Sequence, residues 1–143
     1  MSDLSQAEKQ ALIRAALDAR TRAVAPYSRF AVVAALRSID GQVFTGCNIE
    51  NAAYTPSNCA ERTALFKAVS EGAREFSMLA VVGAPAGQQP PFPVTGPCGV
   101  CRQALNEFCE LDMPILLVTG PDSWTEVTLG ELLPYNFGPK DLA

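Results

Sequence analysis

Apolar and polar positions follow helical and strand periods in turn along this chain, and each change of period marks a predicted element. A capping box, Ser5-Gln6-Ala7-Glu8, opens a first helix that is predicted to end before Pro26, because the residue before a proline avoids helical backbone. Two more helices are predicted over residues 58–71 and 97–111. Five strands are predicted over residues 30–36, 42–48, 78–82, 115–119 and 124–128.

The order of these elements indicates the fold class. Asp40-Gly41 between the first two strands is a hairpin signal, and the wholly apolar runs at 78–82 and 115–119 are typical of strands covered on both faces. The pattern therefore predicts an α/β fold, a three-layer α/β/α sandwich with a mixed five-stranded sheet. A length of 143 residues without repeat or linker predicts one domain over residues 1–143.

Net charge, apolar runs and cysteine count limit the partners that this protein can bind and the cell compartment in which we expect it. The net charge of −4 argues against a nucleic-acid surface, which would need a basic face. No apolar run is long enough to span a membrane, and the first residues do not resemble a secretory signal. Five cysteines, an odd number, fit a reducing cytoplasm better than a disulfide framework, so we expect a cytoplasmic protein. The absence of histidine excludes any nitrogen-ligand zinc site.

Two cysteine motifs carry the strongest chemical signal. Cys59-Ala60-Glu61 and Pro97-Cys98-Gly99-Val100-Cys101 both fall where a predicted helix begins, and helix N-termini favour thiolate over thiol. Three thiolates can hold one zinc ion and leave its fourth position open for water, as hydrolytic zinc sites do. The sequence therefore predicts one zinc per chain, bound by three cysteines. Cys47 and Cys109 are interpreted instead as small core residues.

Glu61 and Arg62 each allow two interpretations. With Asn58 as the N-cap, Glu61 would occupy the third helical position and bond back to the cap backbone. Beside a three-ligand zinc, its carboxylate is better placed to move protons during hydrolysis, and we favour that role. Arg62 is either a solvated surface residue or a donor that tempers the negative charge of three thiolates on one zinc ion.

Asn48 and Glu50 end the second predicted strand. Strand alternation puts them on one face and turns Ile49 into the core. An amide beside a carboxylate suits a pair of sugar hydroxyls, although both residues are also common polar turn residues. Because the chain is acidic and has no glycine-rich phosphate loop, we expect an uncharged nucleoside rather than a nucleotide.

These motifs resemble the cytidine deaminase family, in its small homotetrameric form with three zinc-binding cysteines. The resemblance implies that Cys59, Cys98 and Cys101 bind zinc, that Glu61 shuttles protons and that Arg62 tempers the thiolate charge. It further implies that Asn48 and Glu50 bind ribose, that Phe30 forms an aromatic wall, and that Phe137 closes the pocket of a neighbouring subunit. The matching segments are residues 27–32, 46–52, 58–64, 97–103 and 132–137.

The expected activity is zinc-dependent deamination of cytidine and deoxycytidine to uridine and deoxyuridine, in pyrimidine salvage. A deaminase of another aminopyrimidine nucleoside-like compound is the nearest alternative. A non-catalytic, zinc-stabilised interaction module is a second, which would leave Glu61, Asn48 and Glu50 without a role. One departure from the family is Val33, where relatives usually have glycine, and we expect it to alter local packing or an interface rather than the chemistry.

Overall fold

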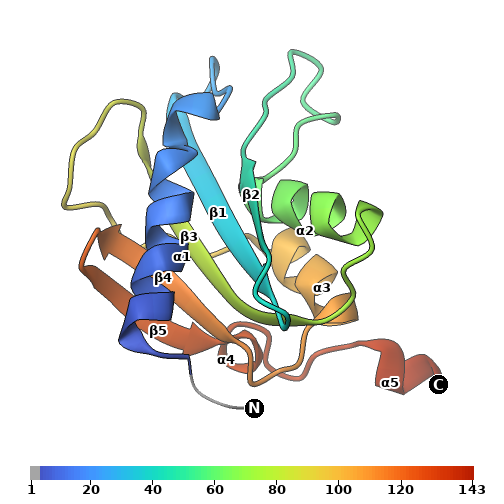
Figure 1. Ribbon diagram of the computed structural model, residues 1–143. Helices are drawn as coiled ribbons and strands as arrows, with labels where there is room; N and C mark the ends of the chain where they lie inside the picture. Colours follow the sequence, from blue (N-terminus) through green and yellow to red (C-terminus); the bar gives the residue numbers. More distant parts are fainter. Residues whose placement is uncertain (1–3) are drawn as a thin grey trace.

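The short apolar runs of the sequence form one five-stranded sheet in the computed structural model, which describes residues 4–143 (Figure 1). The strands lie in the order β2-β1-β3-β4-β5. Only the β3–β4 pair is parallel among these neighbours, so the sheet is mixed, as predicted. The strands are β1 (Phe30–Ser38), β2 (Val43–Cys47), β3 (Phe76–Pro85), β4 (Pro114–Gly120) and β5 (Ser123–Thr128).

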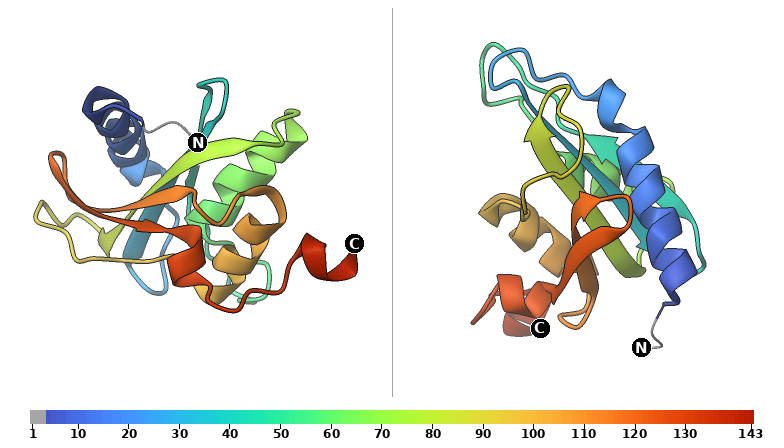
Figure 2. Two further views of the ribbon diagram at one scale, coloured as in Figure 1. Left: turned by 90° about the horizontal axis from the view of Figure 1, so that it is seen from below. Right: turned by 90° about the vertical axis from the view of Figure 1, so that its left-hand side faces the viewer.

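Helices cover both faces of the sheet, which confirms the predicted three layers (Figure 2). On one face, Leu12 and Ile13 of α1 pack with Val33. On the other face, Leu65 of α2 and Leu105 of α3 belong to a second apolar cluster. The helices are α1 (Gln6–Asp18), the 3-10 helix η1 (Arg20–Arg22), α2 (Ala60–Ser70), α3 (Gly99–Phe108), α4 (Leu129–Leu132) and α5 (Pro139–Leu142).

β3 is the central strand and is buried from Phe76 to Ala84. This position explains why its sequence is a continuous apolar run instead of an alternation. Val33 on the neighbouring strand is completely buried in the cluster under α1. Its bulk is therefore accommodated by core packing, one of the two outcomes that the sequence suggested.

Several predicted boundaries are wrong. The first helix was expected to continue as far as Pro26, but it ends at Asp18 and the 3-10 helix η1 (Arg20–Arg22) follows. Val24 then pairs through its backbone with Asn48 and Glu50, so the chain has left the helix before Pro26 is reached. The third helix spans Gly99–Phe108 rather than 97–111, since Cys98 and Cys109 both have extended backbone angles. No helix in the described residues 4–143 is long and apolar enough to cross a membrane.

Candidate metal centre

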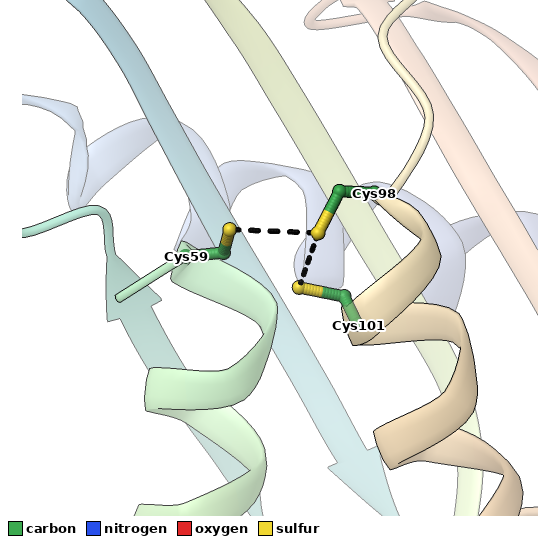
Figure 3. Close-up of side chains that lie close together, drawn as sticks. All are labelled: Cys59, Cys98 and Cys101. Carbon is green, nitrogen blue, oxygen red and sulfur yellow. Dashed lines mark hydrogen bonds between the residues drawn. The ribbon is translucent and has the colours of Figure 1, made fainter. Parts of the chain in front are cut away.

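Three cysteine thiols converge where α2 and α3 begin (Figure 3). Cys59 is the N-cap of α2, Cys98 is the N-cap of α3, and Cys101 lies in the first turn of α3. The sulfur atoms are 3.7 Å apart between Cys59 and Cys98 and 3.4 Å apart between Cys98 and Cys101, and all three lie within 4.8 Å of one another.

This spacing fits a tetrahedral zinc ion. With Zn–S bonds of about 2.3 Å, two sulfur ligands of one tetrahedral zinc lie about 3.8 Å apart. The cluster therefore matches three corners of a tetrahedron. Within the described part of the chain, no other group of three or more potential metal-binding side chains comes together. The prediction of a three-cysteine zinc site is consistent with this geometry.

The surroundings favour a thiolate before any metal binds. Neither cap cysteine uses its sulfur to cap its helix, so both sulfurs stay available to a metal. Interaction with the Cys101 thiol, and a hydrogen bond from Arg62, lower the pKa of Cys59 to about 5. Arg62 donates through Nη2 to the Cys59 sulfur at 3.4 Å, and this contact raises the pKa of Arg62. Arg62 thus contacts the cluster, as one of its two interpretations required.

Glu61 is the only buried carboxyl group in the part of the chain that the structure describes. Its side chain is 3% exposed, and Oε1 has no hydrogen-bond partner. Burial is the main cause that raises the pKa of Glu61 to about 7. A carboxyl group poised near neutral pH, and not bonded to the protein through Oε1, is suited to accept and release protons.

The capping interpretation of Glu61 is wrong. Cys59, not Asn58, is the N-cap of α2, so Glu61 is the second helical residue instead of the third. No side-chain capping bond is formed at this helix end. In contrast, Glu8 at the third position of α1 does form the predicted capping box with Ser5. The two glutamates therefore differ in role although both lie in a first helical turn.

A cavity of about 310 Å³ opens beside the cysteine cluster. Its lining includes the charged side chains of Glu50, Glu61 and Arg62 together with smaller polar and apolar side chains. A cavity of this size and composition is suited to a small molecule. Six of the residues singled out from the sequence line it, namely Asn48, Glu50, Cys59, Glu61, Arg62 and Cys98.

Asn48 and Glu50 line this cavity from the segment that follows β2, and both side chains are held by hydrogen bonds. The Asn48 amide accepts from Val32 N at 3.0 Å and donates to Phe30 O at 2.8 Å. The Glu50 carboxylate accepts from the Ser28 hydroxyl and from the backbone N–H groups of Tyr27 and Ser28, which lowers its pKa. These bonds fix both side chains and leave each with further hydrogen-bonding capacity for a ligand.

The predicted burial of Ile49 is wrong, since this residue is 44% exposed. β2 ends at Cys47, and Ile49 forms isolated bridges with Val24 and Asn58 outside the sheet. Strand alternation therefore placed Asn48 and Glu50 correctly on the same side of the chain, where both line the cavity. It was wrong for Ile49, because the strand and its buried face end at Cys47.

The two aromatic candidates lie elsewhere. Phe30 is not among the residues that line the cavity; a side chain added at Gly83 would meet the rings of Phe30 and the methyl group of Thr95 at 3.0 and 2.8 Å. Phe137 is 59% exposed, and its carbonyl accepts hydrogen bonds from Gln103 at 2.8 Å and Asn106 at 3.1 Å. Its ring is thus presented to the outside of the chain from a fixed backbone.

Sequence reasoning missed five residues of the cavity wall: Val32, Ser57, Asn58, Thr95 and Gly96. Val32 could have been found, because it lies two positions after Phe30 on β1 and so shares its face. Thr95 and Gly96 belong to a connection without periodicity, so no sequence signal fixed where they lie.

The remaining cysteines stay outside the cluster. Cys109 is buried in the apolar core, and burial raises its pKa to about 12. Cys47 is half-buried and donates to Arg22 O at 3.4 Å. The interpretation of Cys109 as a core residue is confirmed, whereas Cys47 lies at the margin of the core.

The amino-acid sequence of this chain is similar to a known protein family and to individual proteins of known sequence. Residues 6–116 match a family described as the cytidine and deoxycytidylate deaminase zinc-binding region. Cytidine deaminase of Sporosarcina psychrophila is 49% identical over 132 residues, which cover 92% of this chain and 93% of that protein. Cytidine deaminase of Halalkalibacterium halodurans is 48% identical over 135 residues, or 94% and 98% of the two chains.

Solved structures agree with the sequence relatives. The crystal structure of cytidine deaminase from Burkholderia pseudomallei superposes with a TM-score of 0.78 at 46% identity, covering 89% of this chain and 97% of that one. The crystal structure of cytidine deaminase from Mycobacterium tuberculosis gives a TM-score of 0.75 at 36% identity, covering 95% and 99%.

Proposed function

The chain belongs to the cytidine and deoxycytidylate deaminase family, and we propose that it hydrolyses cytidine and deoxycytidine to uridine and deoxyuridine, with release of ammonia. Such a reaction serves pyrimidine salvage. The single observation that carries this proposal is the buried Glu61 carboxyl group, unpartnered at Oε1, beside three converging thiols at the cavity.

Each residue of the site has a role in this reaction. Cys59, Cys98 and Cys101 would hold one zinc ion, which supplies Lewis-acid activation of water when bound. Glu61 accepts the proton that water loses as its oxygen bonds to C4 of the pyrimidine. Glu61 then passes this proton to N3. As the C4–N4 bond breaks, Glu61 takes the proton of the new C4 hydroxyl and gives it to the departing amine, so that ammonia leaves and the C4 carbonyl forms. Arg62 keeps the Cys59 thiolate stabilised through its hydrogen bond.

The nucleoside is held by residues that are already fixed before it binds. Asn48 and Glu50 would bind the ribose hydroxyls, because their side chains line the cavity in orientations set by backbone hydrogen bonds. Val32 and Thr95 supply small walls for the base, with Phe30 beside Thr95. A panel of cytidine, deoxycytidine, cytosine, CMP and adenosine, monitored by absorbance, tests the proposal and separates it from deamination of a different nucleoside-like compound.

Free cytosine is expected to be a poor substrate, with kcat/KM roughly 10⁴-fold below that of cytidine, because polar groups built to bind hydroxyls are left unpaired without them. The measurement is initial rate against concentration for both compounds with one preparation. Equal kcat/KM values would remove Asn48 and Glu50 from substrate recognition.

The proposal includes a homotetramer in the cytoplasm. All five cysteines are free thiols, which suits a reducing compartment. Large apolar side chains stay exposed on one chain, including Phe66 at 51%, Val100 at 60% and Phe137 at 59%. In the proposed tetramer, these side chains would be covered by neighbouring copies of this chain.

Replacing Phe137 by alanine is expected to raise KM for cytidine by roughly tenfold, because the lost ring would open the cavity of a neighbouring subunit. Leu142→Ala is the matched control, since Leu142 is 80% exposed and lies five residues further along the same segment. Kinetics are measured together with sedimentation. Full activity of a chain that sediments as a monomer would contradict this role of Phe137.

A further inference from the structure

The connection from β3 to Cys98 forms part of the cavity, although little regular structure supports it. Thr95 and Gly96 line the cavity just before the zinc-site cysteine. Residues 86–98 contain no helix or strand. Before Pro97, which adjoins Cys98, Phe92 is the one buried residue of this segment. The backbone of this connection, here called the β3–α3 loop (residues 86–98), must therefore be held by specific contacts.

Arg20 supplies several of these contacts from a distant part of the sequence. Its Nη1 donates to Gln88 O at 2.9 Å, and its Nη2 donates to Ala84 O at 3.2 Å and Pro85 O at 3.1 Å. Its guanidinium carbon lies 4.8 Å from the centre of the Phe92 ring. One planar group thus joins the end of β3, the start of the loop and the buried aromatic residue of the loop.

The second half of the loop is held by hydrogen bonds from Phe92 and Thr95 to the neighbouring strands. Phe92 N donates to Thr119 O at 2.8 Å, and the Thr95 hydroxyl donates to Gly83 O at 3.0 Å. A Cβ at Gly83 would lie 2.8 Å from the Thr95 methyl group, so the close approach of the loop to β3 depends on glycine. Arg20 and Phe92 hold the first half of the loop, and Thr95 sets the second half against the cavity.

Arginine is suited to this position by geometry. The guanidinium group offers five donors in one plane and can stack on an aromatic ring at the same time, which the single ammonium of lysine cannot do. Burial lowers the pKa of Arg20, and its buried Nε has no partner, so holding this group here costs free energy.

We propose that Arg20 is a positioning residue that holds the β3–α3 loop so that Thr95 and Gly96 complete the substrate cavity. It does not line the cavity itself. This inference rests on the proposed deamination for its kinetic readout. Its structural readout, the mobility of the loop, does not depend on any activity.

The test compares Arg20→Gln with Arg22→Gln, a control on the same short helix η1 whose side chain is exposed. For Arg20→Gln we expect KM for cytidine to rise by roughly tenfold, with kcat within about twofold and zinc retained. Hydrogen exchange measured by mass spectrometry should become faster in peptides covering residues 86–97. Arg22→Gln should change neither quantity, and Arg20→Lys should recover part of the loss.

Phe92→Leu gives a second test that keeps apolar bulk and removes the ring under the guanidinium group. It should speed exchange in the same peptides and raise KM in the same direction. A lower melting temperature for Arg20→Gln with unchanged KM and unchanged loop exchange would reduce Arg20 to a structural contact and overturn the proposal. Faster loop exchange in a protein that deaminates no pyrimidine nucleoside would retain the loop contact but overturn the proposed function.

Discussion

Glu61→Gln is expected to lower kcat for cytidine by at least roughly 10²-fold while the chain keeps its zinc. Glutamine preserves the size of the side chain and its place in the first turn of α2, but it cannot take up a proton from water. The effect should be large because Oε1 of Glu61 is buried and bonded to no other protein group, whereas Glu50, the other carboxylate of the cavity, is held by hydrogen bonds from Tyr27 and Ser28. Initial rates and elemental analysis of the same preparation measure both quantities.

Glu71→Gln provides the matched control, since Glu71 is the exposed residue that ends the same helix. This change should leave kcat, KM and zinc content as in the unmodified chain. Turnover of Glu61→Gln near the unmodified rate would show that some other group moves the protons. Loss of zinc from Glu61→Gln would instead show that its carboxyl group supports the metal.

The layers of the fold and the metal cluster could be predicted because each has a local signal. Buried strands such as β3 appear as continuous apolar runs, and the capping box at Ser5 marks the start of α1. The cysteine cluster follows from helix starts. Residues three apart at the beginning of α3 share one face, and Cys59 begins the neighbouring helix.

The parts that could not be predicted depend on contacts between distant segments. The position of Glu61 in α2 depends on which residue is the N-cap of the helix, and this residue is Cys59 instead of Asn58. Arg20 contacts residues more than sixty positions away, as its bond to Gln88 shows. Thr95 reaches the cavity because Gly83 lacks a side chain, which no pattern within the loop indicates.

Two roles that the resemblance implied stay predictions, namely the aromatic wall at Phe30 and the intersubunit role of Phe137. Their common feature is that a base or a second subunit must be present for the contact to exist. The single domain over residues 1–143, which was predicted from length, also stays a prediction. The kinetic and sedimentation experiments above address Phe137 directly, and the substrate panel addresses the cavity.

Cys98→Ser is expected to lose most of its zinc and to lower activity by roughly 10³-fold or more, because one of three protein ligands is removed. Cys98 is the suitable cysteine to replace, since it is exposed and a hydroxyl group there disturbs no core packing. Loss of zinc should also be visible without any substrate. A bound metal stabilises the folded state, so a chelator should lower the melting temperature of the unmodified chain but not that of Cys98→Ser.

Cys109→Ser separates loss of zinc from loss of stability. Cys109 is buried in the core on the α2 and α3 face, so its hydroxyl replacement should lower the melting temperature. It lies outside the three-thiol cluster, so zinc content should stay at one per chain and the effect of the chelator should persist. Cys47→Ser should likewise keep its zinc. If Cys98→Ser retained full zinc and full activity, the three-thiolate site would be wrong, and with it the role given to Glu61. If Cys109→Ser lost zinc as completely as Cys98→Ser, general unfolding would explain both results.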